Sequence, residues 1–537
     1  MKKTGSLLIF FMLVGAVVAA GTVFWRNGAM YSKSGASVPE SQYGAFLAAQ
    51  HAIYVNDFDA AKDFSGALTA TDVASVQNIK MMSQFLAGTL PENVDDLKKE
   101  SGTPARLIYD AWLVNNDKWD ELYSRHKNDK SALAAPLRIW SSVAVNHKTE
   151  VLKFVESLET RNAWKSFVRG QIYAETGDID KAKEEFIAVS PSFMNINDYL
   201  YIMSFYIHHG FDDFANDLKN EFTAQPGGMF MADFNNIPDW SEYSGIKNAL
   251  AFSLIQNVSH TQVMMYSDLA VLLLRFAQVT GAGVSGDTGA INYYLGQYFF
   301  NNNGDYEKYF SQIKSSSPYY PFAMLRMAEG AGDVLKLRSV LREYPTFVPA
   351  INKLVAYHIS HGNKRAALRI INRALDNDAL SDYNHGFFLK SRAQIYFAFG
   401  DLTRAQADLR AAADVLIIDG EISALQAKIW AAENRELDTA YEYAIGLVKQ
   451  NPSDVFAWDV LGRVVAAREG VDAAIEMLAR VAEVANTCSS LFDNLGDLYA
   501  LSGNTKMARD AYLRAIELSD DGLVVAPRVQ QKLRNMK

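Results

Sequence analysis

Apolar side chains near the carboxyl end of the chain recur at helical spacing, in runs of about a dozen residues separated by short polar breaks. From Trp458 to Val481 the break is REGVD, and from Asn494 to Ile516 it is SGNTK. A glycine between two amphipathic runs is typical of the end of a helix. Each segment is therefore predicted to be a pair of antiparallel helices joined by a turn at Gly470 or Gly503.

The two segments are copies of one another at a constant offset. The aligned pairs, each 34 residues apart, are Trp458 and Phe492, Leu461 and Leu495, Gly462 and Gly496, Ala474 and Ala508, and Leu478 and Tyr512. Glycine or alanine allows two helices to cross closely, while the larger side chains fill the space beside the crossing. One hairpin cannot bury its apolar face alone, so consecutive hairpins are expected to stack.

The same order of small and large residues occurs further upstream. The copies lie at 46–68, 167–191, 199–218, 351–375 and 387–413. The first is the weakest, with Asn56 at the expected turn and Ala61 after it. The pattern resembles the tetratricopeptide repeat, clearly over 42–75, 163–229 and 348–522, whereas about 230–347 departs from it.

The resemblance implies an all-α protein: a right-handed superhelical solenoid of antiparallel helix pairs, preceded by an N-terminal apolar helix. The chain is similar in arrangement to the membrane-anchored or exported members of this family in bacterial envelopes. The expected organisation is a signal peptide or anchor at 1–26, a linker at 27–41, N-terminal repeats at 42–229, degenerate repeats at 230–347, the C-terminal array at 348–522 and a C-terminal tail at 523–537.

The amino end combines Lys2 and Lys3 with an uncharged segment from Ser6 to Trp25. Twenty apolar residues suffice for a membrane-spanning helix, but a basic start, an apolar core and small residues also suit a cleaved signal peptide. The sequence predicts a single-pass protein of the bacterial inner membrane with the solenoid in the periplasm, or a soluble periplasmic protein if the segment is cleaved. A solenoid facing the cytoplasm is the topological alternative.

Composition narrows the classes of partner. The net charge is -9 and the pI about 5.6, so the whole chain lacks the basic footprint of a nucleic-acid-binding protein. The short basic run from Gln530 to Lys537 is predicted to be a solvated helix end. The single cysteine, Cys488, excludes an intrachain disulfide and a four-thiolate zinc site, and is expected to be buried or half-buried.

Candidate motifs for chemistry are weak. GAGVSG, from Gly281 to Gly286, fits a dinucleotide-binding pattern, but the preceding segment has a helical period where a strand is needed, so a loop is favoured. His208 and His209 are adjacent, and His358, His361 and His385 could supply metal ligands, although helix-end roles are favoured. No metal site, cofactor or enzymatic activity is predicted. The alternative is an enzyme, or a regulatory subunit of one, with its site in 224–347, where an insertion breaks the repeat.

The tetratricopeptide resemblance implies that the first helix of each hairpin lines a concave groove. The polar groove positions would be Lys390, Gln394, Asp459, Arg463, Asp493, Asn494 and Asp497. Because these residues mix carboxylates with single cations, the expected ligand is a protein or peptide partner carrying some positive charge. The predicted function is a non-enzymatic scaffold for protein–protein interaction.

Overall fold

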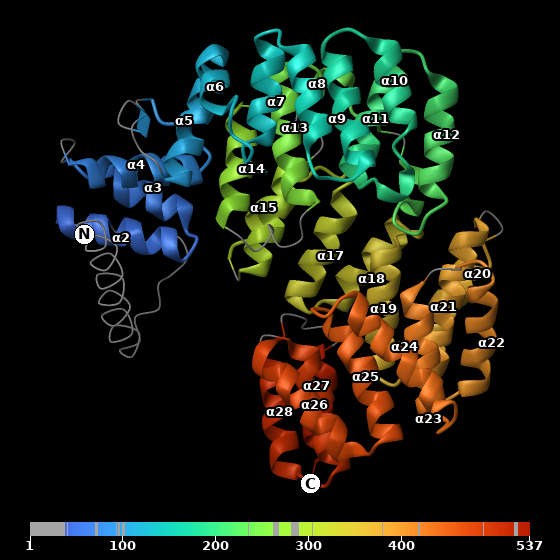
Figure 1. Ribbon diagram of the computed structural model, residues 1–537. Helices are drawn as coiled ribbons and strands as arrows, with labels where there is room; N and C mark the ends of the chain where they lie inside the picture. The colour runs from blue at the N-terminus through green and yellow to red at the C-terminus, as the bar shows by residue number, and fades with distance from the viewer. Residues whose placement is uncertain are drawn as a thin grey trace. The chain divides into compact units, whose positions relative to one another are not determined.

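The computed structural model describes residues 38–536, apart from 40, 70–72, 93, 95–96, 99–101, 235, 261–267, 281–288, 303, 378–379, 417–418, 487 and 520–524. Every regular element within this part of the chain is a helix, as the sequence predicts. The chain forms two compact units, Met1–Trp112 and Leu113–Lys537, and each is described by itself (Figure 1).

The first unit contains α2 (Gln42–Tyr54), α3 (Phe58–Gly66), α4 (Ala74–Leu86) and most of α5 (Thr103–Asn115). The helices of the second unit up to the end of the irregular middle are α6 (Trp119–His126), α7 (Ala135–Ala144), α8 (Lys148–Ser157), α9 (Asn162–Glu175), α10 (Ile179–Ile187), η2 (Pro191–Phe193), α11 (Ile196–His208), α12 (Asp212–Thr223), η3 (Met229–Asp233), η4 (Trp240–Glu242), α13 (Ile246–Ser259), α14 (Asp268–Thr280), α15 (Ala290–Asn301), α16 (Glu307–Phe310), α17 (Tyr320–Ala331) and α18 (Val334–Glu343).

The remaining helices of the second unit form the C-terminal array and its end. They are α19 (Val348–Ser360), α20 (Lys364–Leu375), α21 (Asp382–Ala398), α22 (Leu402–Ala413), α23 (Gly420–Ala432), α24 (Leu437–Gln450), α25 (Val455–Arg468), α26 (Val471–Val484), α27 (Ser489–Leu501), α28 (Thr505–Glu517) and α29 (Val525–Asn535). Successive pairs pack as hairpins, and each hairpin packs on the next.

In the first unit, α2 and α3 form the weak copy of the repeat. Asn56 lies at the turn with φ +61°, a left-handed conformation that asparagine tolerates better than most residues. Ala45, Ala49, Ala61 and Phe64 form the core between the helices. The predicted turn at Asn56, with Ala61 after it, is confirmed.

The crossing of the two helices explains why small residues recur. A Cβ atom added to Gly496 on α27 would lie 2.4 Å from the ring of Tyr512 on α28. The equivalent distance from Gly170 to the ring of Phe186 is also 2.4 Å, and in both hairpins the ring lies sixteen residues after the glycine. Because these contacts are much shorter than van der Waals separation, only glycine allows this approach. The predicted turn glycine of the same hairpin, Gly503, has φ +80°.

The irregular middle of the second unit contains a variant of the same hairpin. A Cβ atom added to Gly296 on α15 would lie 2.4 Å from the ring of Phe310. This ring follows the glycine by fourteen residues, and α16, which carries it, is only four residues long. The shorter spacing explains why the small residues of this hairpin fall out of register with the 34-residue pattern.

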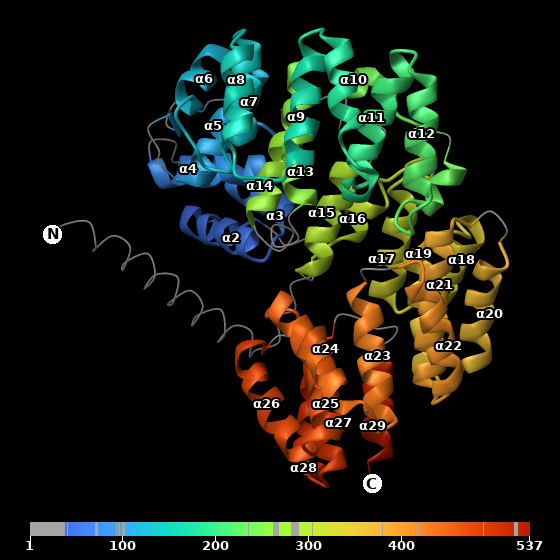
Figure 2. The same ribbon diagram turned by 45° about the vertical axis from the view of Figure 1, so that its right-hand side comes forward.

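Helix α13 lies along the first helices of three earlier hairpins. The indole Nε1 of Trp140 on α7 donates to Ser253 Oγ on α13 at 2.8 Å. The ring of Phe252 lies 6.1 Å from that of Phe167 on α9 and 4.9 Å from that of Tyr201 on α11. Figures 1 and 2 show α13 beside the row of α7, α9 and α11. The inner face of these hairpins is therefore packed against the chain itself.

The carboxyl end is a helix end with Gln530, Gln531 and Arg534 exposed, as the sequence predicts, but one face of it is packed on the array. Helix α29 packs on α27 and α28, and Val529 is buried with Ala508, Tyr512 and Ala515. The apolar face of the last hairpin is thereby covered, as stacked repeats require.

The prediction of a single-pass inner-membrane protein is corrected. A spanning helix needs about 20 predominantly apolar residues, and the longest described helix, α21, has 17 residues. In the part of the chain that the structure describes, no helix is both long and apolar enough to cross a membrane. The predicted N-terminal apolar helix, Ser6 to Trp25, lies outside the described residues.

Candidate functional site

The seven predicted groove residues all lie on first helices of the C-terminal array. Lys390 and Gln394 are on α21, Asp459 and Arg463 are on α25, and the other three are on α27. The structure joins most of them to the neighbouring repeat through ion pairs and hydrogen bonds. Their contacts form what we call the polar ladder, along α21, α23, α25, α27 and α29. Figure 2 shows where these five helices lie.

The first step of the ladder is Lys390, whose side chain is 6% exposed. Its Nζ lies 2.6 Å from Asp419 Oδ2 and 2.8 Å from Glu421 Oε2, at the start of α23. Burial lowers the pKa of Lys390, but the hydrogen bonds to Asp419 and Glu421 outweigh burial and raise the pKa above its ordinary value. The ammonium group is therefore held by α23 and is not presented to a partner.

The middle of the ladder joins three helices. Lys428 Nζ on α23 lies 3.0 Å from Asp459 Oδ2 on α25, and Arg463 Nε lies 3.0 Å from Asp459 Oδ1. Arg463 also donates to Asn494 Oδ1 on α27 at 3.4 Å. Burial raises the pKa of Asp459, but the charges of Lys428 and Arg463 outweigh it, so the pKa lies below its ordinary value. Asp459 is thus an ionised link between repeats.

The last step is made by the helix at the carboxyl end. Arg528 Nη2 and Lys532 Nζ on α29 lie 2.7 and 2.8 Å from the two oxygens of Asp493. Lys532 Nζ is also 2.7 Å from Asp497, whose Oδ1 accepts from the Tyr512 hydroxyl at 2.8 Å. Arg528 and Lys532 of α29 therefore neutralise the two carboxylates that were expected to face a partner.

Two of the seven residues stay accessible: Gln394 is exposed, and the side chain of Arg463 is 47% exposed. Sequence analysis missed Lys428, Arg528 and Lys532 as partners of the acidic positions. A signal was present, because Lys428 and Asp459 are 31 residues apart, as are Arg463 and Asn494. This spacing joins one first helix to the next.

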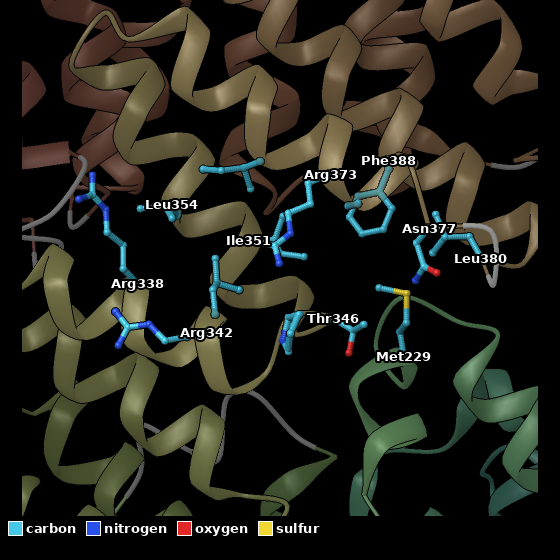
Figure 3. A pocket seen from close by; sticks show the side chains of 14 residues that line it. Met229, Arg338, Arg342, Thr346, Ile351, Leu354, Arg373, Asn377, Leu380 and Phe388 are labelled. Carbon is cyan, nitrogen blue, oxygen red and sulfur yellow. The ribbon is translucent and has the colours of Figure 1, made fainter.

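A cavity of about 520 Å³ lies between α18 and α20. Arg338 and Arg342 from α18 and Arg373 from α20 line it, together with Thr346. Figure 3 shows the two α18 arginines on one side and Phe388, Asn377 and Leu380 on the other. Its apolar lining includes Met229, Leu341, Ile351, Leu354 and Phe388. We call it the arginine cavity, and no sequence motif indicated it.

The arginine cavity has an unbalanced charge. All three arginines are exposed, and none forms an ion pair with a residue that the structure describes. Helix α20 carries Lys364 and three arginines in twelve residues, with no acidic residue. Burial lowers the pKa of His358 on α19, and the charges of Arg338 and Arg369 lower it further. Positive charge from α18 and α20 therefore acts on the same region.

The insertion and the irregular middle, predicted as the alternative enzymatic site, contain a second cavity of about 300 Å³. Its lining includes the aromatic residues Tyr293, Tyr294, Tyr319 and Phe322. Asn197 Nδ2 donates to the Tyr294 hydroxyl at 3.0 Å, and the Tyr319 hydroxyl donates to Asn197 Oδ1. These buried hydroxyl groups form hydrogen bonds with Asn197. They do not provide support for a catalytic site in this segment.

The remaining candidate motifs are the histidines, the GAGVSG segment and Cys488. Among the described residues no cluster of three or more histidine, cysteine or acidic side chains could hold a metal ion. The His361 ring stacks on Tyr357 at 4.1 Å, which suits a helix-end residue. The GAGVSG segment, Gly281 to Gly286, lies outside the described residues. Cys488 is free and half-buried, as predicted.

Comparison with known proteins supports the repeat. Residues 489–521 match the family model described as tetratricopeptide repeat. No curated protein sequence matches the chain. The crystal structure of the APC/C hetero-tetramer Cut9-Hcn1 is similar over 92% of this chain and 97% of that chain, with 12% identity and a TM-score of 0.26. The crystal structure of yeast Tom70 is similar over 80% and 96%, with 13% identity and a TM-score of 0.29.

These TM-scores are below 0.5, so neither likeness supports an inference about partner or function. The family match at 489–521 coincides with α27 and α28, the hairpin in which Gly496 meets Tyr512. Together with the stacked helical pairs, this match supports a tetratricopeptide-repeat protein.

Proposed function

We propose that this tetratricopeptide-repeat chain is a non-catalytic scaffold that binds a protein or peptide partner on the first helices of its C-terminal array, residues 348–522. The observation that carries the proposal is a contrast between two arrays. The first helices α7, α9 and α11 are packed against α13, whereas Gln394 and Arg463 remain exposed or half-exposed on α21 and α25.

The polar ladder has a supporting role in this proposal. Lys390, Asp459 and Asp493 hold consecutive first helices in register, so the accessible side chains sit on a preformed surface. A rigid surface binds with a smaller entropic cost than one that must be ordered by its partner. Gln394 and Arg463 are the residues expected to contact the partner.

Site-specific photo-crosslinking in the full chain tests the proposal. A benzophenone amino acid at position 394 or 463 should capture a discrete partner in cells. The same group in place of Glu184, an exposed residue on α10, is the control and should not capture it. Equal capture from all three positions, or no capture from 394 and 463, would contradict the proposal.

Charge reversal at Arg463 is the second arm of the experiment. Arg463→Glu should weaken capture through position 394 because the change alters an accessible side chain of the proposed surface. Reversal of Asp459 is unsuitable because Asp459 is a mostly buried link between Lys428 and Arg463. Unchanged capture in Arg463→Glu would place the partner elsewhere on the chain.

A further inference from the structure

The arginine cavity has the chemistry of an anion-binding surface. Its three arginines lack an ion pair within the described part of the chain, and the guanidinium group is well suited to pair with carboxylates. The chain as a whole is acidic, with a net charge of -9. A local concentration of unpaired arginine against that background favours a negatively charged ligand at this site.

The lining of the cavity distinguishes a peptide from a small inorganic anion. Ile351 and Leu354 provide apolar surface near the arginines, and Met229 and Phe388 provide it on the opposite side. A phosphate ion would leave this surface in contact with water, whereas an acidic peptide could cover it with its apolar side chains. A volume of about 520 Å³ also lies within the usual range of ligand-binding pockets.

Thr346 adds a polar group to this lining. Its Oγ1 is buried and has no hydrogen-bond partner among the described residues. Leaving a buried hydroxyl unpaired is unfavourable. A carbonyl oxygen of a bound peptide would accept a hydrogen bond from this hydroxyl, which an apolar ligand could not do.

The spacing of the arginines suits an extended peptide. Arg338 and Arg342 are one helical turn apart on α18, a rise of about 6 Å along the helix axis. Alternate residues of an extended strand are separated by about 7 Å and lie on the same side. Carboxylates at alternate positions of a strand could therefore pair with both arginines.

We propose that the arginine cavity binds an extended acidic peptide segment of a partner protein, with alternate carboxylates on Arg338 and Arg342, a further anionic group on Arg373, and apolar side chains on Ile351, Leu354 and Phe388. This surface lies on the second helices α18 and α20 and the helices beneath them. It is distinct from the first-helix surface of the proposed scaffold function, on Gln394 and Arg463.

Fluorescence anisotropy with a defined probe tests the inference on the full chain. The probe is a fluorescein-labelled octapeptide in which glutamate alternates with leucine or alanine, and its control replaces every glutamate by glutamine. The acidic probe should bind at least tenfold more tightly than the control, and its affinity should fall as salt rises. Equal affinities for the two peptides, or no binding of the acidic peptide, would overturn the inference.

Matched variants assign that binding to the cavity. The double variant Arg342→Glu, Arg373→Glu should lose at least tenfold in affinity for the acidic probe. The double variant Arg410→Glu, Arg509→Glu changes two exposed arginines on other second helices, α22 and α28, and alters net charge equally. It should stay within twofold of the parent. An equal loss in both would show that net charge, and not the cavity, governs binding.

Two further measurements separate the alternatives. Thr346→Val removes the hydroxyl with little change in shape. It should lower the affinity for the acidic probe by about three- to tenfold if the hydroxyl pairs with the peptide backbone.

Single-stranded RNA and phosphatidylserine vesicles should bind no better to the parent than to the Arg342→Glu, Arg373→Glu variant. A loss of RNA or vesicle binding in that variant, with weak peptide binding, would overturn the peptide in favour of those ligands. Crosslinking at positions 394 and 463 does not depend on these results, so the two proposals can fail separately.

Discussion

The first helices of the second unit meet two different surroundings. On α7, α9 and α11 they present Trp140, Phe167 and Tyr201, which pack against α13. On α21, α25 and α27 the corresponding surface carries Lys390, Asp459 and Asp493, each of which pairs with a charged residue of a neighbouring first helix or of α29. The same hairpin thus supports an aromatic, internally covered face in one array and, in the other, a polar face closed by ion pairs on which Gln394 and Arg463 remain accessible.

The difference shows that the hairpin and its inner surface are specified by separate residues. Glycine at the crossing, as at Gly170 and Gly496, sets the distance between the two helices in both arrays. The residues facing inward are different residues, although Phe167 packs against the crossing ring of Phe186 and Asp497 accepts a hydrogen bond from the crossing residue Tyr512. They decide whether the face buries apolar area or stays in water. A repeat can therefore keep its geometry while its inner surface changes from core to binding surface.

Removing the aromatic contact of α13 should have the largest effect. Phe252 is buried and lies against Phe167, Tyr201 and Tyr243. Phe252→Ala should destabilise the second unit by about 3–5 kcal/mol, because it removes a buried ring and leaves a cavity. The midpoint of thermal unfolding, followed by circular dichroism, measures this loss of stability. Faster proteolysis around α13 would show that the loss arises there.

Phe456→Ala is the matched control, since Phe456 is an exposed phenylalanine of the C-terminal array. It should change stability by less than about 1 kcal/mol. Equal losses in the two variants would remove the distinction between the covered and the accessible array.

The pH dependence of stability should also arise from the covered array. Glu175 Oε2 accepts from the Gly245 amide, just before α13, at 2.8 Å. Burial raises the pKa of Glu175 from 4.5 to about 7, so the folded chain retains a proton that the unfolded chain releases near pH 4.5. This contribution to stability is complete below pH 4.5 and is lost as the pH rises through 7, a change on the order of 3 kcal/mol.

Thermal melts between pH 4.5 and 8 test this sign. The parent should lose stability as the pH rises, and Glu175→Gln should lose less because glutamine has no proton to release. His260 should remain in the variant as a smaller contribution of the same sign. Burial lowers its pKa, but the hydrogen bond to Asp198 raises it above the ordinary value, so its stabilisation is present below pH 6.5 and is lost above its folded pKa. A steeper pH dependence in Glu175→Gln than in the parent would contradict the assignment.

A third change probes the feature that the two arrays share. Gly496→Ala would place a methyl group 2.4 Å from the Tyr512 ring, and the Tyr512 hydroxyl is held by Asp497. Overpacking of this kind should cost about 1–3 kcal/mol. Gly446→Ala on α24, where no atom lies within 4 Å of the added carbon, should be neutral or stabilising, because alanine favours helix over glycine. Chemical unfolding compares the pair, and similar losses would show that crossing distance does not explain the glycines.

The smallest effect is expected at Arg463, the accessible arginine of the polar ladder. Arg463→Ala removes a pair with Asp459 at 3.0 Å, in which the arginine side chain is 47% exposed. Half-exposed ion pairs contribute little because water screens them, so stability should fall by less than about 1 kcal/mol. A larger loss in urea unfolding would show that Arg463 is a structural link and unsuitable as a partner-binding residue.

The sequence predicted the hairpins well and the surroundings of their inner faces poorly. Gly503 at the turn and Gly496 at the crossing follow from spacing within one hairpin, and the structure places both as expected. The groove residues were placed on the correct helices, but Asp493 was expected to face a partner and instead pairs with Arg528 and Lys532. The pairing was missed because the basic end of the chain was expected to be solvated.

The sequence by itself determined a chain of helical hairpins, because each hairpin depends on residues less than 34 positions apart and repeats its signature. Only the tertiary structure decided which inner face is covered: Trp140 meets Ser253 across more than one hundred residues, and no periodic pattern connects them. The arginine cavity also depends on tertiary structure, since Met229 and Phe388 line it from segments that are distant in the sequence. Contacts of this range depend on how the stacked hairpins curve and where an inserted segment returns, and these follow from packing over the whole unit.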